Sequence, residues 1–199
     1  MNLIKTFTTN KLAACLLAIG LCVTTTNYAC NTDQWLSTIG RYLPVAIQVA
    51  QSIVGLIGVF NTAASTEDQA IVKQIGDEAT KDFQLLQSLY QQYESKPSAD
   101  TKAQIETVLA TIVNNLPDLL ATAHIKDPGL LQKVTASVNI VVTIADVIIA
   151  QIPVSNPQLK ARKAAKRAVR PMTPAGVKAA WDSEVCGGNS ACTVLVKGS

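Results

Sequence analysis

Charged and aromatic side chains are both scarce in this chain of 199 residues. Only 16% of its residues are charged and 5% aromatic, whereas 48% are hydrophobic. A chain this apolar is not expected to be disordered, because it can bury enough surface to offset the entropy lost on folding. With so few rings, the core has to be built from Leu, Ile, Val and Ala, which favours closely packed helices.

Histidine is nearly absent, and this argues against metal sites and catalytic sites that need several histidines. The single histidine, His124, cannot supply the two Glu-x-x-His pairs of di-iron helical proteins. The chain also lacks Cys-x-x-Cys-His, His-Glu-x-x-His, Gly-x-Ser-x-Gly and the glycine patterns that bind phosphate. We therefore expect no enzyme, no metal and no cofactor, and we assign His124 a structural role at a helix C-terminus.

The first 29 residues are typical of an export signal. Lys5 and Lys11 precede an apolar run from Leu12 to Val23, which is too short to cross a bilayer comfortably. A polar stretch then leads to the small residue Ala29. We predict that residues 1–29 are removed and that the protein is exported to the periplasm or outer envelope, or secreted.

Cysteine usage fits such a compartment. Two of the five cysteines lie in the apolar run, so three remain after cleavage. Cys186 and Cys192 bracket a flexible loop that contains Gly187 and Gly188, and we expect them to form a disulfide. Cys30 would then stand at the new N-terminus, where lipidation, an intermolecular disulfide and a free thiol all stay open.

Four helical patterns of similar length follow, with apolar residues at steps of three and four. The first covers about residues 32–61, and Pro44 is expected to kink or split it. Ser65, Ser98 and Asp127-Pro128 are N-terminal caps for the other three, and the fourth ends near Ile152. We predict an all-α, antiparallel up-and-down four-helix bundle over residues 30–154.

Residues 155–199 form a basic C-terminal extension in this interpretation. From residue 160 onward, eight Lys or Arg face two acids, whereas acids outnumber bases by 12 to 7 between residues 30 and 159. Six of the bases could contact an anionic surface, such as lipid headgroups, or a partner: Lys160, Arg162, Lys163, Lys166, Arg167 and Arg170. A short helix after Thr173-Pro174 presents Trp181, which either plugs one end of the bundle or docks a partner.

Carboxylates offer few candidates for a site. Those of the second helix, including Asp68 and Asp82, are expected mainly on its solvated face. Asp146 stands in an otherwise apolar stretch, where a lone carboxylate is costly to bury. We place Asp146 at an exposed helix edge with Asn139; the alternative is a polar pocket between the helices.

The functional prediction follows mainly from these absences. We expect an exported, non-enzymatic helical bundle that acts through protein or cell-surface contacts, with peripheral membrane contact included and nucleic acid excluded. Two alternatives stay open. One is a membrane-active protein that inserts its first and fourth helices, and the other is a carrier for an apolar ligand.

Overall fold

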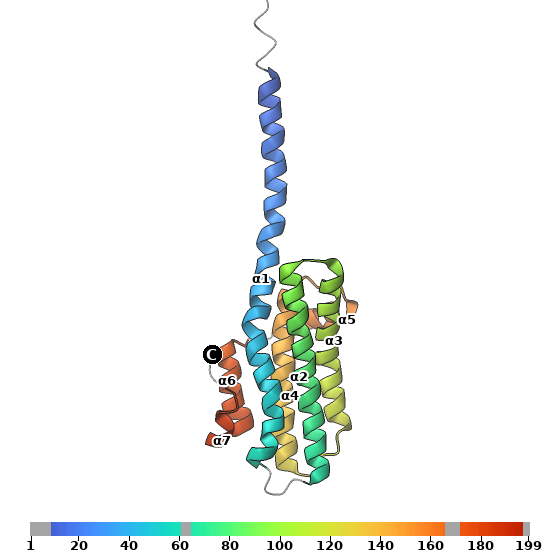
Figure 1. The fold of residues 1–199 in the computed structure, drawn as a ribbon, viewed down its shortest axis with the longest axis vertical. Helices are drawn as coiled ribbons and strands as arrows, with labels where there is room; N and C mark the ends of the chain where they lie inside the picture. The colour runs from blue at the N-terminus through green and yellow to red at the C-terminus, as the bar shows by residue number, and fades with distance from the viewer. Residues whose placement is uncertain (1–8, 61–64, 166–171, 197–199) are drawn as a thin grey trace, which may run out of the picture.

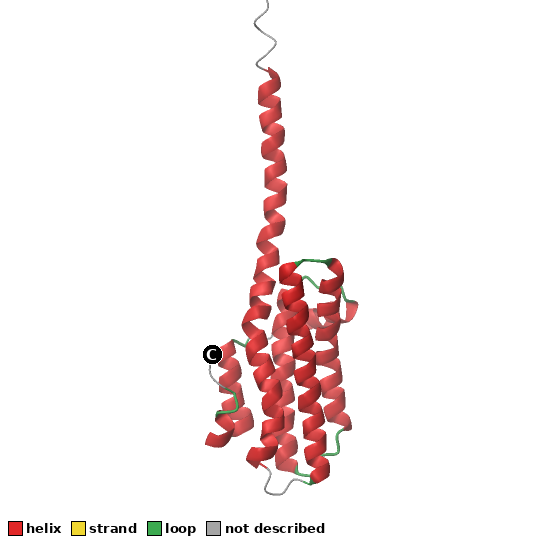
Figure 2. Ribbon diagram, viewed as in Figure 1, coloured by secondary structure: helices red, strands yellow, loops and turns green. Residues whose placement is uncertain are grey.

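The computed structural model describes residues 9–60, 65–165 and 172–196, with side chains from residue 35 onward. Every regular element in these residues is a helix (Figures 1 and 2), which confirms the predicted all-α class. The elements are α1 (Thr9–Phe60), α2 (Thr66–Ser95), α3 (Ala99–Thr122), α4 (Pro128–Gln151), α5 (Pro157–Ala165), α6 (Pro174–Ala180), the π-helix η1 (Trp181–Cys186) and α7 (Ser190–Thr193).

The four long helices lie side by side and alternate in direction (Figure 1). Helices adjacent in the chain pack against each other, and α4 also packs against α1. The first helix begins at Thr9, well before the predicted start near Thr32, and its N-terminal part projects beyond the other helices (Figure 1).

The helix starts are set by the side chains expected from the sequence. The hydroxyl of Ser65 accepts a hydrogen bond from the Asp68 amide, and that of Ser98 from the Thr101 amide. The Asp127 carboxylate accepts from the Leu130 amide at 2.7 Å, with Pro128 in the first turn. Each cap satisfies an amide that has no partner inside its helix.

Pro44 does not split α1, which continues unbroken from Thr9 to Phe60. Its ring lies on the exposed side of the helix, whereas Leu43, Val45 and Ala46 are buried. Packing of the neighbouring residues keeps the helix intact although Pro44 cannot donate a backbone hydrogen bond. Pro117 likewise lies inside α3, which ends at Thr122.

The core is mainly aliphatic, as the composition predicts, with a few large rings. Trp35, Phe83 and Trp181 are the largest fully buried aromatic side chains. Trp35 in the middle of α1 contacts Tyr93 near the C-terminal end of α2, with ring centroids 5.0 Å apart.

Gly76 lets α1 and α2 approach closely. A Cβ atom at this position would lie 2.6 Å from Val54 Cγ2 and 3.2 Å from the Val54 backbone nitrogen. Any side chain at Gly76 would therefore push the two helices apart.

Residues 172–196, here called the C-terminal module, contain α6, η1 and α7. They pack along the sides of α1 and α4 (Figure 1). Helix α5 lies apart from the module and contacts α3 and α4. The C-terminal extension therefore divides into two parts that contact different helices.

Replacing Gly76 with Ala should destabilise the fold by about 1–3 kcal/mol, because overpacking outweighs the better helix propensity of Ala. Gly58→Ala is the matched control, since nothing lies within 4 Å of a Cβ there. That variant should gain up to about 1 kcal/mol. Chemical denaturation measures both changes, and a Gly76→Ala protein as stable as the parent would contradict the close approach.

Candidate functional site

The basic segment around α5 was the main candidate for a contact surface, and the structure divides its residues. Lys160 is exposed to solvent. Arg162 instead forms two hydrogen bonds with the Asp146 carboxylate, through Nε and through Nη2 at 3.2 Å. Lys163 donates to the Ile152 carbonyl at 2.9 Å. The other three bases, Lys166, Arg167 and Arg170, lie outside the described residues.

The pairing with Arg162 overturns both expectations for Asp146. Its side chain is only 11% exposed, so it does not mark a solvated edge, although Asn139 is exposed as expected. Nor does it face a polar pocket, because the guanidinium of α5 covers it. A bidentate, largely buried pair of this kind fixes α5 on α4. The only sign of this pair in the sequence was a lone acid shortly before a basic segment.

Glu106 of α3 anchors the turn between α4 and α5. This buried carboxylate accepts hydrogen bonds from the Ser155 and Asn156 amides at 2.8 and 2.7 Å and lies 3.2 Å from Lys102 Nζ. Burial raises the pKa of Glu106, but the two amides and Lys102 lower it more, so its pKa ends below the ordinary value. Glu106 is therefore a structural anion.

Asp68 has the same role at the other end of the molecule. The sequence placed it mainly with the solvated acids of α2, but it is buried and accepts from the Lys126 and Asp127 amides at 2.9 and 3.2 Å. The Lys126 amide is the main reason that the pKa of Asp68 is lowered. Asp68 thus holds the turn between α3 and α4.

Asp82 is also buried, and this contradicts its expected place on the solvated face of α2. It is 5% exposed, and no hydrogen-bond donor among the described residues reaches its Oδ2 atom. Burial raises the pKa of Asp82 to about 6, the negative charge of Glu78 adds to this effect, and Lys81 opposes it. Asp82 therefore titrates closer to neutrality than an ordinary carboxyl group.

The C-terminal module carries Trp181, the proposed docking residue, inside the fold. Trp181 is 0% exposed, and its Nε1 donates to the Cys192 carbonyl at 3.3 Å. Because η1 packs along the side of α4, the indole neither plugs an end of the bundle nor presents itself to a partner. The sequence pattern identified an apolar face but not what covers it.

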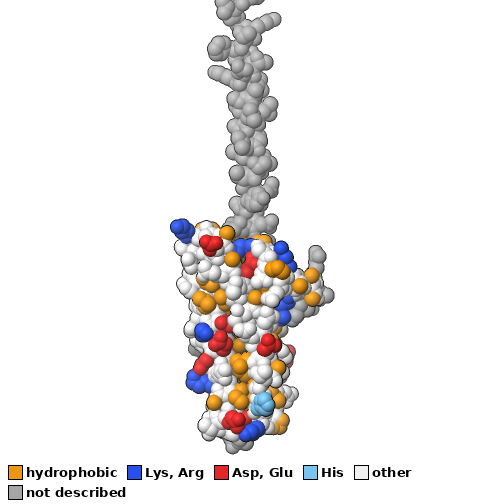
Figure 3. Space-filling model, turned by 90° about the vertical axis from the view of Figure 1, so that its right-hand side faces the viewer, with side chains coloured by type: hydrophobic (Ala, Val, Ile, Leu, Met, Phe, Trp, Pro, Cys, Tyr) orange, Lys and Arg blue, Asp and Glu red, His pale blue; other side chains and the backbone are white. Residues whose placement is uncertain are grey.

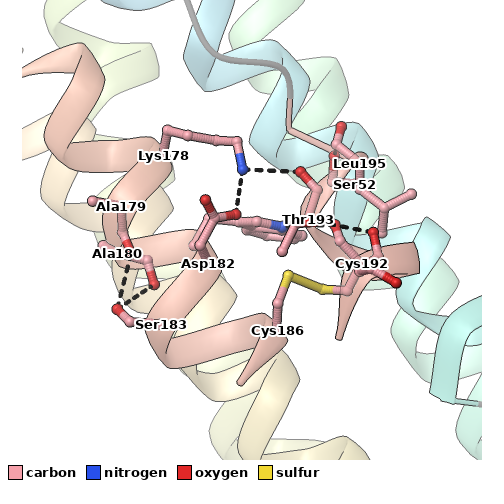
Figure 4. Close-up of polar contacts among 12 residues, drawn as sticks. Ser52, Lys178, Ala179, Ala180, Asp182, Ser183, Cys186, Cys192, Thr193 and Leu195 are labelled. Carbon is pink, nitrogen blue, oxygen red and sulfur yellow. Dashed lines mark hydrogen bonds and ion pairs between the residues drawn. A yellow bond between two sulfur atoms is a disulfide. The ribbon is translucent and has the colours of Figure 1, made fainter. Parts of the chain in front are cut away.

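Cys186 and Cys192 are joined within the module (Figure 4), with Cα atoms 5.3 Å apart. Gly187 and Gly188 have φ angles of 56° and 86°, which reverse the chain after η1. Lys178 donates to the Thr193 carbonyl at 2.9 Å and pairs with Asp182 (Figure 4). These contacts fold the module onto itself. Cys30 lies in the part of α1 whose side chains fall outside the described residues.

Two hydroxyl groups of α1 bind the module. Ser52 donates to the Leu195 carbonyl at 2.8 Å (Figure 4), and Tyr42 donates to the Met172 carbonyl at 2.5 Å. Both acceptors are backbone atoms, so no side-chain pattern predicts these pairings.

His124 lies two residues after the end of α3, with Nδ1 2.8 Å from the Thr122 carbonyl oxygen, near the helix C-terminus where a structural role was expected. Among residues with described side chains, no three His, Cys, Asp or Glu gather closely enough to hold a metal ion.

Comparisons with protein-family models, curated proteins and solved structures find no match to this chain. The geometry alone therefore carries the functional argument.

Replacing Asp82 with Asn should make the protein more stable at neutral pH. Between the ordinary pKa of 3.8 and about 6, the folded state binds more protons than the unfolded state. The free energy of unfolding of the parent should fall by roughly 2 kcal/mol relative to Asp82→Asn as pH rises from 4 to 7. Denaturant titrations across this range measure the difference. A pH-independent difference between the parent and Asp82→Asn would contradict a buried, titrating carboxyl group.

The disulfide should contribute about 2 kcal/mol to stability, the value expected for so short a loop. In guanidinium titrations, reductant should lower the unfolding midpoint of the parent and of Cys30→Ser by similar amounts. The double variant Cys186→Ser, Cys192→Ser should already be less stable and should not respond to reductant. A double variant that still responded would show that another cysteine pair is involved.

Proposed function

We propose that this chain is an exported, non-enzymatic protein that acts through contacts with a protein or with the cell surface. Its scaffold is an antiparallel up-and-down four-helix bundle. The packing of α1 against both α2 and α4, and of α3 against its two neighbours, supports that architecture. The titratable groups that we find buried hold turns or pack within helix interfaces, which supports a scaffold role over catalysis.

Export rests on the N-terminal pattern and on the module. Lys5 and Lys11 precede the apolar run, and the paired sulfurs of Cys186 and Cys192 suit an oxidising compartment. Cys30 is the residue at which lipidation or an intermolecular disulfide would decide between an anchored and a free protein.

The observation that carries the contact proposal is that some bases near α5 bind within the fold while Lys160 does not. Arg162 and Lys163 are engaged within the fold, whereas Lys160 is free to meet a partner. With Lys166, Arg167 and Arg170 it forms the contact set of four bases. On the face drawn in Figure 3, charges of both signs are scattered rather than gathered into one patch. The contact set belongs to residues 160–170, which hold six bases and no acid.

Neutralising the contact set by Lys160→Gln, Lys166→Gln, Arg167→Gln and Arg170→Gln should weaken binding to vesicles of phosphatidylcholine with anionic phosphatidylglycerol by at least tenfold. Each basic residue near such a surface contributes about 1 kcal/mol. Co-sedimentation at rising salt measures the effect, and the parent should lose its binding as the salt screens the charges.

The matched control removes four exposed lysines elsewhere: Lys73→Gln, Lys81→Gln, Lys96→Gln and Lys126→Gln. It changes the net charge equally and should bind like the parent. Equal losses in both variants would show that only net charge matters. If the parent does not bind lipid, capture from envelope fractions with the parent and the contact-set variant tests the protein-partner form, and a captured partner lost in the variant supports it.

A further inference from the structure

The two helices best suited by composition to cross a membrane lie against each other. The most apolar 18-residue windows within Trp35–Phe60 of α1 and Pro128–Gln151 of α4 have mean hydropathies of 1.9 and 1.8. The 26 and 24 residues of these two segments correspond to about 39 and 36 Å of helix, more than the roughly 30 Å of a bilayer core. Only 44% of the apolar window in α1 is buried, so the fold does not fully enclose this helix.

The C-terminal module rests on this pair of helices. Both α6 and α7 contact α1, while α6 and η1 contact α4. The module contributes Val177, Trp181, Val185 and Val196, all fully buried. Leu195 packs where α1 has Gly55, with its Cδ2 atom 3.0 Å from the position that a Cβ would take. The module thus removes from water a surface shared by the two most apolar helices.

The attachment of the module is mainly apolar. Ser52 and Tyr42 each donate one hydrogen bond to its backbone, whereas the disulfide and the pair of Lys178 with Asp182 lie inside the module. The shape of the module is therefore fixed covalently, but its attachment to α1 and α4 depends on packing. Any change that deforms the module should weaken this packing.

The topology allows α1 and α4 to leave the rest of the fold together. The α2–α3 hairpin starts and returns at the same end of the molecule (Figure 1), so it can swing aside without crossing the pair. Residues 42–60 of α1 contain no charged side chain. In α4, Lys133 and Asp146 each lie within about two turns of a helix end, where charged groups can reach the membrane interface.

We propose that the C-terminal module is a detachable cover over α1 and α4, and that the uncovered pair inserts into a lipid bilayer. The cover keeps the protein water-soluble while it is attached. Insertion depends on apolar surface, not on the charges of the contact set, so the two proposals can fail separately.

Flotation with vesicles of phosphatidylcholine alone, together with dye release from them, tests this proposal. Neutral lipid removes the electrostatic attraction on which the contact set relies. The parent should float weakly and release little dye. The double variant Cys186→Ser, Cys192→Ser, whose module is no longer cross-linked, should float and release dye at least tenfold more. Ser52→Ala, which removes one bond to the module, should show a smaller rise of about twofold.

Ser98→Ala is the control, because it removes the N-terminal cap of α3 inside the α2–α3 hairpin and leaves the module untouched. It should float like the parent despite its lower stability. An equal rise for Ser98→Ala would mean that general unfolding exposes the lipid-binding surface, and it would overturn the cover. If the double cysteine variant is unfolded by circular dichroism, Ser52→Ala decides, and no rise in that folded variant overturns the proposal. Strong flotation of the parent with its module in place would also overturn it.

Discussion

Burial of one face of α1 is the interaction on which the other elements depend. Between Trp35 and Phe60 this helix contacts α2, α4, α6 and α7. Side chains such as Ile53 and Leu56 are fully buried there, and each contributes about 2 kcal/mol when removed from water. Because these side chains are aliphatic and Gly76 has no side chain, the backbones come close. The scarcity of aromatic residues therefore allows the helices to pack at short distances.

Buried carboxylates hold the turns between helices, which aliphatic packing alone does not fix. Asp68 and Glu106 each accept two backbone amides from a turn, one at each end of the long helices. Their lowered pKa values stabilise the fold above the unfolded-state pKa, and this contribution is lost as pH falls through the folded-state pKa. Asp82 has the opposite pH dependence, because burial raises its pKa and no donor among the described residues reaches its Oδ2 atom. Asp68 and Glu106 therefore hold turns as anions, whereas Asp82 does not.

Local signals predicted the starts of α2, α3 and α4, but they did not predict the roles of single polar residues. Ser65, Ser98 and Asp127 act within three residues of their partners, so their caps could be predicted. Asp146 meets Arg162 sixteen residues away, across the turn after α4. Glu106 meets Ser155 at a separation of 49 residues. Contacts of this kind depend on how helices pack, and no periodic pattern records them.

The sequence by itself determined the all-helical class, the starts of α2, α3 and α4, the aliphatic core and the spacing that lets Cys186 reach Cys192. These features follow from periodicity, caps and chain length, which act over a few residues. Only the tertiary structure decided that the C-terminal module covers α1 and α4 and that Trp181 is buried within it. An apolar helix face in the sequence indicates that some other segment must cover it. Which segment covers it depends on how distant parts of the chain pack.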